Sequence, residues 1–434
     1  MRAPLRTVVV VAVAAVALLG IGAVFGLRSP APAPAASVVA GAPDRLAESI
    51  ARAQDRLRAL PRDHETWAAL GLAYVEQARV TADPSLYPKA AGALERSLAV
   101  RATENPAALV GLGALANARH EFAAARAYAT DALAANPYDA DAYAVLADAH
   151  TQLGDAAAAT AAIQRMLDLR PGLAAYARAS YDLEQRGSVA EATDLMRRAL
   201  ESAADPADIA FCRNQLGDLA WSVGDLNGAE REYAAGLAAG PGYQALLRGR
   251  SRVAAARGDL PAALADAGAV AARTPTPDSL LEYATLLRLA GNVAEADRQL
   301  TLADAAHRLF VANGGQDDLT GAQLALARGD AAAAVRLAQD EWRRRPFADV
   351  ADVLGWSLHL AGRDAEALPR LRRAVSSAPR NALFAYHLGM VLLASGDSAG
   401  ARDALRQARS VNPYFSPVDG PTAARALSAL EARP

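Results

Sequence analysis

The strongest constraint on this chain is a pair of small residues that recurs at a nearly constant interval. A glycine followed five residues later by alanine occurs at Gly154/Ala159, Gly187/Ala192, Gly224/Ala229, Gly258/Ala263, Gly291/Ala296, Gly329/Ala334, Gly362/Ala367 and Gly396/Ala401. Successive glycines lie about 33–38 residues apart. A fixed period of this length indicates an array of repeated units, each too small to bury a core alone. We therefore expect a repeat protein rather than one large globular core.

The residues that flank each glycine predict the shape of the unit. The next residue is usually aspartate (Asp155, Asp225, Asp259, Asp330 and Asp397), with Ser188, Asn292 and Arg363 as exceptions. Glycine adopts the left-handed conformation that ends a helix, and aspartate or serine caps the start of another. Prolines mark the other boundary, at Pro137, Pro171, Pro206, Pro241, Pro275, Pro346, Pro379 and Pro413. Each unit is therefore predicted to be a helix, a tight turn, a second helix and a proline-marked turn.

Short motifs within the units match those of a known family. The segment Trp67-Ala68-Ala69-Leu70-Gly71-Leu72-Ala73-Tyr74 fits the pattern W-x2-L-G-x2-Y, which belongs to the tetratricopeptide repeat (TPR). The Leu-Gly pair recurs at 112–113, 216–217, 354–355 and 388–389. From about residue 44 to 413 the chain therefore resembles the TPR family. The resemblance implies an all-α fold, a right-handed superhelical solenoid of TPR helix hairpins.

The resemblance divides the chain into about ten TPR-like repeats over residues 64–413, with a cap at each end. Residues 44–63 are expected to form an N-terminal capping helix, and residues 414–434 a C-terminal capping helix and tail. The first repeat carries an insertion around Thr81 to Pro88. Extra residues around Asn313-Gly314-Gly315 interrupt the later half.

Composition excludes several classes of function. The net charge of −2 argues against general attraction to nucleic acid. Lys89 is the only lysine and is followed by two alanines, which excludes a P-loop, and Cys212 is the only cysteine, which excludes disulfides within the chain and multi-cysteine zinc sites. The six histidines form no H-E-x-x-H motif. We therefore expect no catalytic, cofactor-binding or metal-binding residues, and no enzymatic activity.

The N-terminal segment has two interpretations. Residues 7–27 are an uncharged, mostly apolar run between Arg6 and Arg28, and 21 residues of helix span about 30 Å, which is the thickness of a bilayer core. A secretory signal peptide, cleaved near Ala31 to Ala35, is the alternative, but its hydrophobic region is usually shorter. The sequence therefore favours a transmembrane anchor over residues 1–28, followed by a Pro/Ala-rich linker over residues 29–43.

The flanking charges predict the orientation of that anchor. Arg2 and Arg6 outweigh Arg28, which places the N-terminus in the cytoplasm and the repeats outside it, in a single-pass protein of the cell membrane. Cleavage would instead give a secreted protein. Gly22 and Gly26 have the small-xxx-small spacing of helix pairs in membranes, so a weak homodimer is expected there.

In TPR proteins the first helix of each unit lines a concave groove that binds a peptide or a helix. Carried over to this chain, that geometry gives groove candidates at Tyr181, Asn214, Asp218, Trp221, Arg248, Arg252, Arg288, Gln323, Asp352, Trp356, His359 and Tyr386. Arg248 and Arg252 are four residues apart, on one helical face, and are expected to hold a carboxylate of a partner. Trp221 fits a place in the core equally well.

These expectations converge on binding rather than chemistry. The leading interpretation is a membrane-tethered scaffold that mediates protein–protein interactions through a concave groove. The alternative is an assembly factor or chaperone for an envelope or secreted protein complex, similar to other tethered TPR proteins. The tethered TPR regulators of lipopolysaccharide synthesis end in a cysteine-rich metal module. A chain whose only cysteine is Cys212 does not fit that family.

Overall fold

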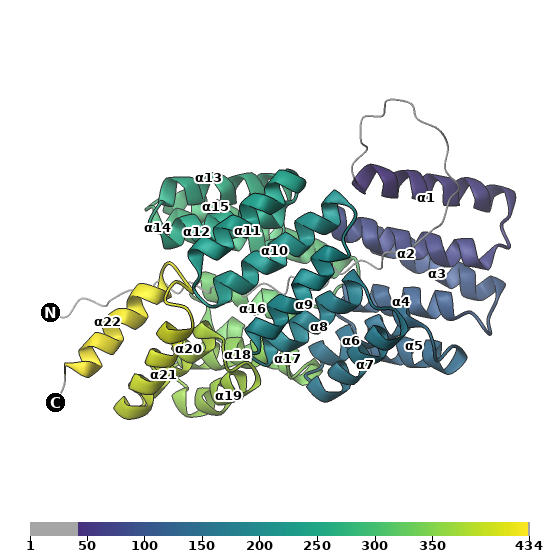
Figure 1. Ribbon diagram of the computed structural model, residues 1–434. Coiled ribbons are helices and arrows are strands. Elements are labelled where there is room, and N and C mark those ends of the chain that lie inside the picture. The colour runs from purple at the N-terminus through teal and green to yellow at the C-terminus, as the bar shows by residue number, and fades with distance from the viewer. Residues whose placement is uncertain (1–41, 433–434) are drawn as a thin grey trace. The chain divides into compact units, whose positions relative to one another are not determined.

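The computed structural model describes residues 42–432 of the chain (Figure 1). These residues form 22 α-helices, one short 3-10 helix and no strand, as the all-α prediction requires. The predicted anchor, with Gly22 and Gly26, and the linker as far as residue 41 lie outside the described residues. Within residues 42–432, none of the helices combines the length and the apolar character needed to span a bilayer.

The described chain falls into two compact units. The amino-terminal unit contains residues 42–179 and 309–316, and the carboxy-terminal unit contains residues 180–308 and 317–432. The helices from the N-terminus to the unit boundary are α1 (Ala42–Ala59), α2 (His64–Thr81), η1 (Pro84–Leu86), α3 (Tyr87–Val100), α4 (Pro106–Ala118), α5 (Phe122–Ala135), α6 (Ala140–Gln152), α7 (Ala156–Leu169) and α8 (Leu173–Gln185).

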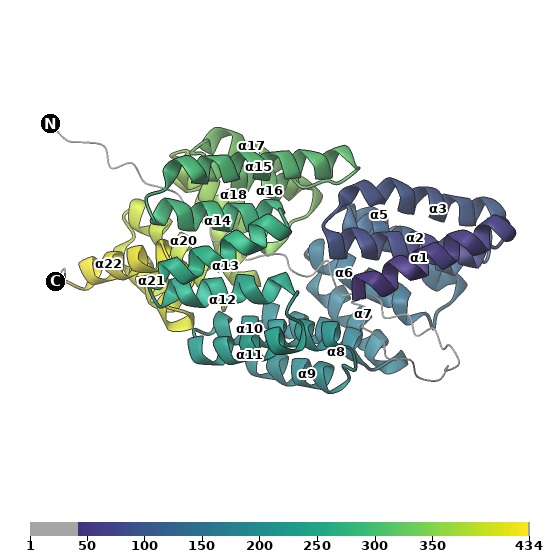
Figure 2. The same cartoon turned by 90° about the horizontal axis from the view of Figure 1, so that it is seen from above.

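The remaining helices complete the hairpins. They are α9 (Val189–Glu201), α10 (Pro206–Ser222), α11 (Leu226–Ala239), α12 (Gln244–Ala256), α13 (Leu260–Arg273), α14 (Pro277–Leu289), α15 (Val293–Ala312), α16 (Asp318–Ala327), α17 (Ala331–Arg344), α18 (Ala348–Leu360), α19 (Asp364–Ser377), α20 (Ala382–Ala394), α21 (Ser398–Val411) and α22 (Asp419–Glu431). At the ends, α1 packs against α2 and α22 against α21 (Figures 1 and 2).

The tight turn of each hairpin has the predicted geometry. The eight repeated glycines have φ angles between 75° and 86°, which is the left-handed region that glycine adopts without steric cost. The aspartates that follow five of them cap the second helix, each accepting a hydrogen bond from the backbone N–H three residues later. Ser188 and Arg363 form no such cap with their side chains. The predictions that these glycines end the first helix and that these aspartates cap the second helix are thus confirmed.

The glycine of the Leu-Gly pair has a separate role, which is to admit a large side chain. A Cβ atom at Gly217 would lie 2.3 Å from the Tyr233 ring, and one at Gly355 would lie 2.6 Å from Cγ of Leu371. Tyr233 and Leu371 each stand nine residues after the turn glycine of their hairpin, and both are fully buried. We call this ninth residue the knob. A glycine socket on the first helix lets the two helices of a hairpin approach closely around it.

Two hairpin turns in the amino-terminal unit have no glycine at the left-handed position: one is at Ala82, which follows α2 and has a φ angle of 52°, and the other is at His120. His120 has a φ angle of 63° at the position where the later hairpins have glycine. Its imidazole stacks on Phe122 at 5.5 Å and contacts Phe310 at 5.2 Å. Phe310 belongs to the extra residues 309–316, whose last N–H, that of Gln316, donates to the carbonyl of Arg119 at 2.8 Å. The inserted segment therefore packs on the turn at His120.

Candidate functional site

The predicted groove residues of the middle repeats occupy equivalent positions on successive first helices. Asn214 on α10 and Arg248 on α12 each lie ten residues before the turn glycine of their hairpin, and Asp218 and Arg252 each lie six residues before it. Because neighbouring first helices pack side by side, equivalent positions come close together. The structure brings all four of these residues into contact with a partner on an adjacent helix or one turn away.

The Asp218 carboxylate is the centre of this arrangement. It accepts hydrogen bonds from Nδ2 of Asn214 at 2.8 Å, from the Tyr233 hydroxyl at 2.8 Å and from the Arg252 guanidinium. Tyr233 was identifiable in the sequence only as a structural TPR position. Its hydrogen bond to Asp218 was therefore not predicted. Burial, and then the nearby Asp218 charge, raise the pKa of the Tyr233 hydroxyl well above its usual value, which keeps it a donor.

Arg248 makes the second ion pair of the region. Its Nε and Nη2 atoms each donate to an oxygen of Glu282 on α14 at 2.6 Å, which is the two-pronged geometry of a strong arginine–carboxylate pair. We name Asn214, Asp218, Arg248, Arg252 and Glu282 the polar network. The sequence predicted that Arg248 and Arg252 together hold a carboxylate of a partner. Each is paired with a carboxylate of its own chain, because a half-buried guanidinium requires a counter-charge nearby.

Two atoms of the polar network have no partner within the described chain. They are Oδ1 of Asn214, a hydrogen-bond acceptor, and Nε–H of Arg252, a donor, and both are buried. The bond from Nδ2 to Asp218 fixes which way the Asn214 amide faces. A buried polar atom without a partner costs free energy. A peptide group, with its carbonyl and its N–H, carries the two complementary groups.

Two acidic side chains near the network were not among the predicted residues. Burial, and then the charge of Asp218, raise the pKa of Glu184 to about 7. Burial raises the pKa of Asp278 to about 6, against the opposing effect of Arg248. Glu184 lies three residues before its turn glycine, as Trp221 and Arg288 do, so the register could have indicated it.

The flanking predicted residues are held by the fold in different ways. Trp221 packs on the cluster around Tyr233, with the Arg252 guanidinium 5.8 Å from its ring centre. Arg288 donates to the carbonyl of Ala327 at 2.6 Å and pairs with Asp297 at 3.0 Å. Tyr181, on α8, is half-buried. Arg288 thus ties α14 to α16 and is not free to bind a partner.

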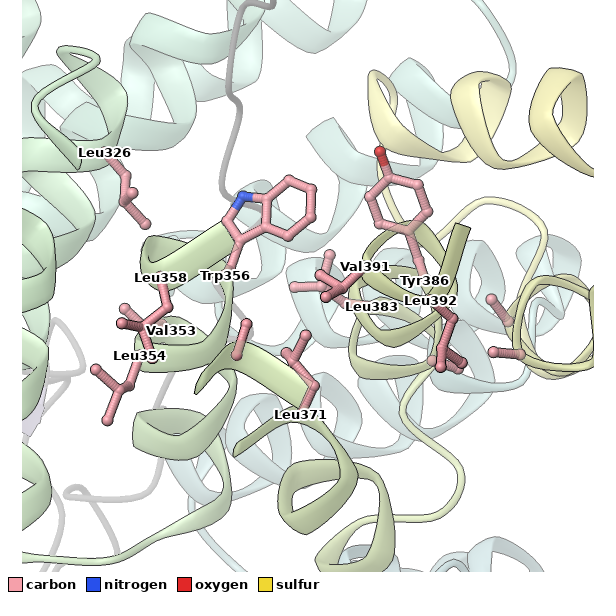
Figure 3. Packing of buried hydrophobic residues seen from close by; sticks show 14 of the residues in the cluster. Leu326, Val353, Leu354, Trp356, Leu358, Leu371, Leu383, Tyr386, Val391 and Leu392 are labelled. Carbon is pink, nitrogen blue, oxygen red and sulfur yellow. The ribbon is translucent and has the colours of Figure 1, made fainter. Parts of the chain in front are cut away.

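The predicted residues of the late repeats are mostly interior. Trp356 and Tyr386 are 6% and 3% exposed, and Figure 3 shows them pointing to the same side of α18 and α20. The Trp356 ring stacks on His387, whose Nδ1 lies 2.9 Å from both oxygens of Asp352. These large rings therefore fill the space between two helices. Gln323 is likewise buried, and His359 pairs with Asp364 at 2.6 Å.

Cys212 is fully buried, and burial raises the pKa of its thiol to about 12, so it is a poor nucleophile. Among residues 42–432, no cluster of three His, Cys, Asp or Glu side chains could hold a metal ion.

A comparison with protein families finds a match over three stretches of the chain. The family model described as "Tetratricopeptide repeat" matches residues 115–174, 214–279 and 361–414. It is the model of a repeat and not of an enzyme. No curated protein sequence matches the chain.

Solved structures of similar proteins share only low sequence identity with the chain. A tetratricopeptide repeat protein from Parabacteroides merdae is 17% identical, covers 60% of this chain and 98% of its own, and has a TM-score of 0.37. A human IFIT1 dimer with PPP-AAAA is 16% identical, with 75% and 77% covered and a TM-score of 0.46. The APC/C hetero-tetramer Cut9–Hcn1 is 15% identical, with 89% and 76% covered and a TM-score of 0.45. The assignment therefore rests on the family model and on the repeat register.

Proposed function

Because the chain is a tetratricopeptide-repeat protein, we propose that it is a membrane-tethered scaffold that binds protein partners on the first helices of its carboxy-terminal unit. Binding would centre on α10, α12 and α14, along the inner face of the right-handed superhelix that the family implies. The partner would contribute an extended segment whose backbone, rather than a terminal carboxylate, is recognised.

One observation carries this proposal. Oδ1 of Asn214 and Nε–H of Arg252 are a buried acceptor and a buried donor, on adjacent first helices, and neither has a partner in the described chain. Both residues are attached to Asp218, which holds them in place. A peptide group carries an N–H for the first atom and a carbonyl for the second, and pairing with both would remove the cost of leaving them unpaired. Because both atoms are covered in the described chain, nearby side chains would have to move aside for it. The charges of Arg248 and Arg252 are already balanced by Glu282 and Asp218. This disfavours binding of an acidic partner by charge attraction alone.

The test combines site-specific crosslinking with a matched pair of variants. The photo-reactive residue p-benzoylphenylalanine is placed at Trp221 in the full chain and, as a control, at Tyr138, which is 73% exposed in the amino-terminal unit. We expect a crosslinked protein at Trp221 that is missing at Tyr138. Asn214→Leu should abolish that product, because it removes the acceptor while keeping the branched shape of the side chain.

Asn117→Leu is the control for a buried asparagine. Asn117 also has an unpartnered Oδ1, and its Nδ2 donates to the carbonyl of Val145 at 3.0 Å, but it lies in the amino-terminal unit. The proposed site is wrong if Asn214→Leu leaves the crosslink intact, or if Asn117→Leu removes it equally while both variants stay folded.

The tether is a separate part of the proposal. Residues 7–27 would anchor the chain, with the N-terminus in the cytoplasm and the repeats outside. Alkaline carbonate extraction should leave the full chain in the membrane fraction and release a chain that lacks residues 1–28. Sequencing the mature N-terminus gives the deciding result, since a chain that begins near Ala36 would mean a cleaved signal peptide and a secreted protein.

The anchor would also bring two copies together weakly through Gly22 and Gly26. Exchange of both glycines for leucine should reduce crosslinking between copies in the membrane and leave partner crosslinking at Trp221 unchanged.

The state of the crosslinked partner protein distinguishes a scaffold from an assembly factor or chaperone. Recovery of a folded, functional complex supports a scaffold. Recovery of clients that are unfolded or lack their cofactor would instead support an assembly factor or chaperone for an envelope or secreted complex.

A further inference from the structure

Two of the turn glycines in the carboxy-terminal unit touch repeats that are far away in the sequence. A Cβ atom at Gly187 would lie 3.1 Å from Cγ of Arg380, and one at Gly224 would lie 3.1 Å from Cδ of Pro413. Nδ2 of Asn412 also donates to the carbonyl of Trp221 at 2.8 Å. By contrast, the turn glycines at 258, 291, 329, 362 and 396 would have no neighbour within 4 Å of an added Cβ. The first and last hairpins of this unit therefore meet along a seam.

A cavity of about 650 Å³ opens beside this seam. Residues of α9, α10 and α11 line it, and its larger apolar residues include Leu216 and Leu219 of α10 and Val223, which directly follows α10. Arg380, from the turn between α19 and α20, closes one end against Gly187. The volume falls in the range of about 300–1,000 Å³ that is usual for small-ligand sites.

Three arginines and three carboxylates line the cavity, but two of the carboxylates are engaged by other groups. Arg231 and Arg380 line it, and neither forms an ion pair with any described residue. The carboxylates of Glu232 and Asp225 are already engaged, the first by Arg213 at 2.7 Å and the second as the cap of α11. Arg231 and Arg380 are thus two arginines of the lining without a counter-charge among the described residues.

Two other charged groups line the same cavity. Arg197 pairs with Asp194 at 2.9 Å, outside the cavity, and Glu191 has no ion pair among the described residues. The unpaired groups are therefore two positive and one negative. Exposed arginines without counter-charges are good partners for oxyanions, because the guanidinium plane matches a carboxylate or phosphate edge.

We propose that this seam cavity binds an oxyanion, carboxylate or phosphate, between Arg231 on α11 and Arg380 at the far side of the seam. The ligand would carry an apolar portion no larger than the area of Leu216, Leu219 and Val223. Since its two arginines come from hairpins about 150 residues apart in sequence, the bound ligand would also hold the seam together. This site is independent of the polar network on the first helices.

The experiment measures binding of three named probes to the purified chain: inorganic phosphate, succinate and a hexaglutamate peptide. Arg380→Gln and Arg231→Gln should each weaken binding about tenfold or more, because each removes a charge-assisted pair of hydrogen bonds. Arg372→Gln is the control, since Arg372 is an exposed arginine on α19 that does not line the cavity. Binding of the free anions would identify a small-molecule site, and binding of the peptide alone would identify an acidic segment of a protein.

Hydrogen–deuterium exchange provides a second readout, which a merely electrostatic surface association would not change. The probe should slow amide exchange in both segments of the seam, around residues 186–190 and 378–382, in the unmodified chain and in Arg372→Gln but not in Arg380→Gln. The proposal is overturned if none of the probes binds at millimolar concentration, or if Arg372→Gln weakens binding as much as Arg380→Gln. It is also overturned if binding leaves exchange in both segments unchanged.

Discussion

The hairpins α4–α5 and α18–α19 have the same register but are filled differently. In the first, the knob is Ala129, and the surrounding cluster consists of alanine and valine, such as Ala125, Ala132 and Val145. In the second, the knob is Leu371, and it belongs to a cluster that contains leucine, tryptophan and tyrosine side chains (Figure 3). All of these residues are buried. The register sets where helices touch, and the size of the knob sets how much apolar area each contact removes from water.

The largest expected difference between the two hairpins is in the response to truncation of the knob. Leu371→Ala should lower the free energy of unfolding by about 2–5 kcal/mol, because Leu371 is fully buried and its removal leaves a cavity beside Gly355. Ala129→Gly should cost only about 1 kcal/mol, which is mainly helix propensity. Urea unfolding followed by circular dichroism measures both.

Leu302→Ala is the control for that measurement, since Leu302 is 52% exposed and should change little. Equal losses for Leu371→Ala and Ala129→Gly would show that knob size does not determine the stability of a hairpin.

The two units can also be compared through the ion pairs that join neighbouring first helices. Asp218→Asn should cost roughly 1–3 kcal/mol, because it leaves the half-buried Arg252 without its counter-charge and weakens two further hydrogen bonds. In the amino-terminal unit, Asp148 pairs with Arg178 through bonds of 2.9 and 2.8 Å. Asp148→Asn should cost less, since fewer donors converge on that carboxylate. A larger loss for Asp148→Asn in thermal unfolding would contradict this ranking.

The units should differ in their response to pH. In the carboxy-terminal unit, burial raises the pKa values of Glu184 and Asp349 to about 7. Between pH 4.5 and 7 the folded chain holds these protons while the unfolded chain has released them. The free energy of unfolding should therefore fall as pH rises through this window, by on the order of 1–3 kcal/mol.

The loss of folding stability at acid pH should come from the amino-terminal unit. Burial opposes ionisation of Asp63, but hydrogen bonds from Thr66 and Arg56 lower its pKa to about 2. Its stabilising effect is present above pH 4 and is lost as pH falls towards 2. Unfolding at several pH values, with Glu184→Gln and Asp349→Asn combined, checks the assignment. The fall between pH 4.5 and 7 should become much smaller in that double variant, with a remainder from Asp278, whose pKa burial raises to about 6. An unchanged fall would mean that other groups cause it.

The sequence predicted the turns and the contacts that depend on small residues, because glycine and aspartate act locally. Glycine adopts the left-handed turn at 154 or 396 without steric cost, and the next aspartate caps the helix that follows. The groove was harder to predict. Arg248 and Arg252 were recognisable as neighbours on one face, but their counter-charges come from Glu282 and Asp218, 34 residues away in each case. The seam was not predictable at all, since nothing near Gly224 indicates that Asn412 lies against it.

The smallest expected effect concerns the turn between α4 and α5, where His120 stands in place of the repeated glycine. At His120, the left-handed conformation costs an ordinary residue about 1 kcal/mol, and stacking on Phe122 and Phe310 offsets it. Both His120→Gly and His120→Ala lose the stacking, but only His120→Gly relieves the backbone. His120→Ala should therefore be the less stable of the two by about 1 kcal/mol. Gly291→Ala, where φ is 79° and no neighbour lies within 4 Å, should show the same difference in urea unfolding. A much smaller value at His120 would mean that the inserted segment 309–316, and not the backbone itself, sets the geometry of that turn.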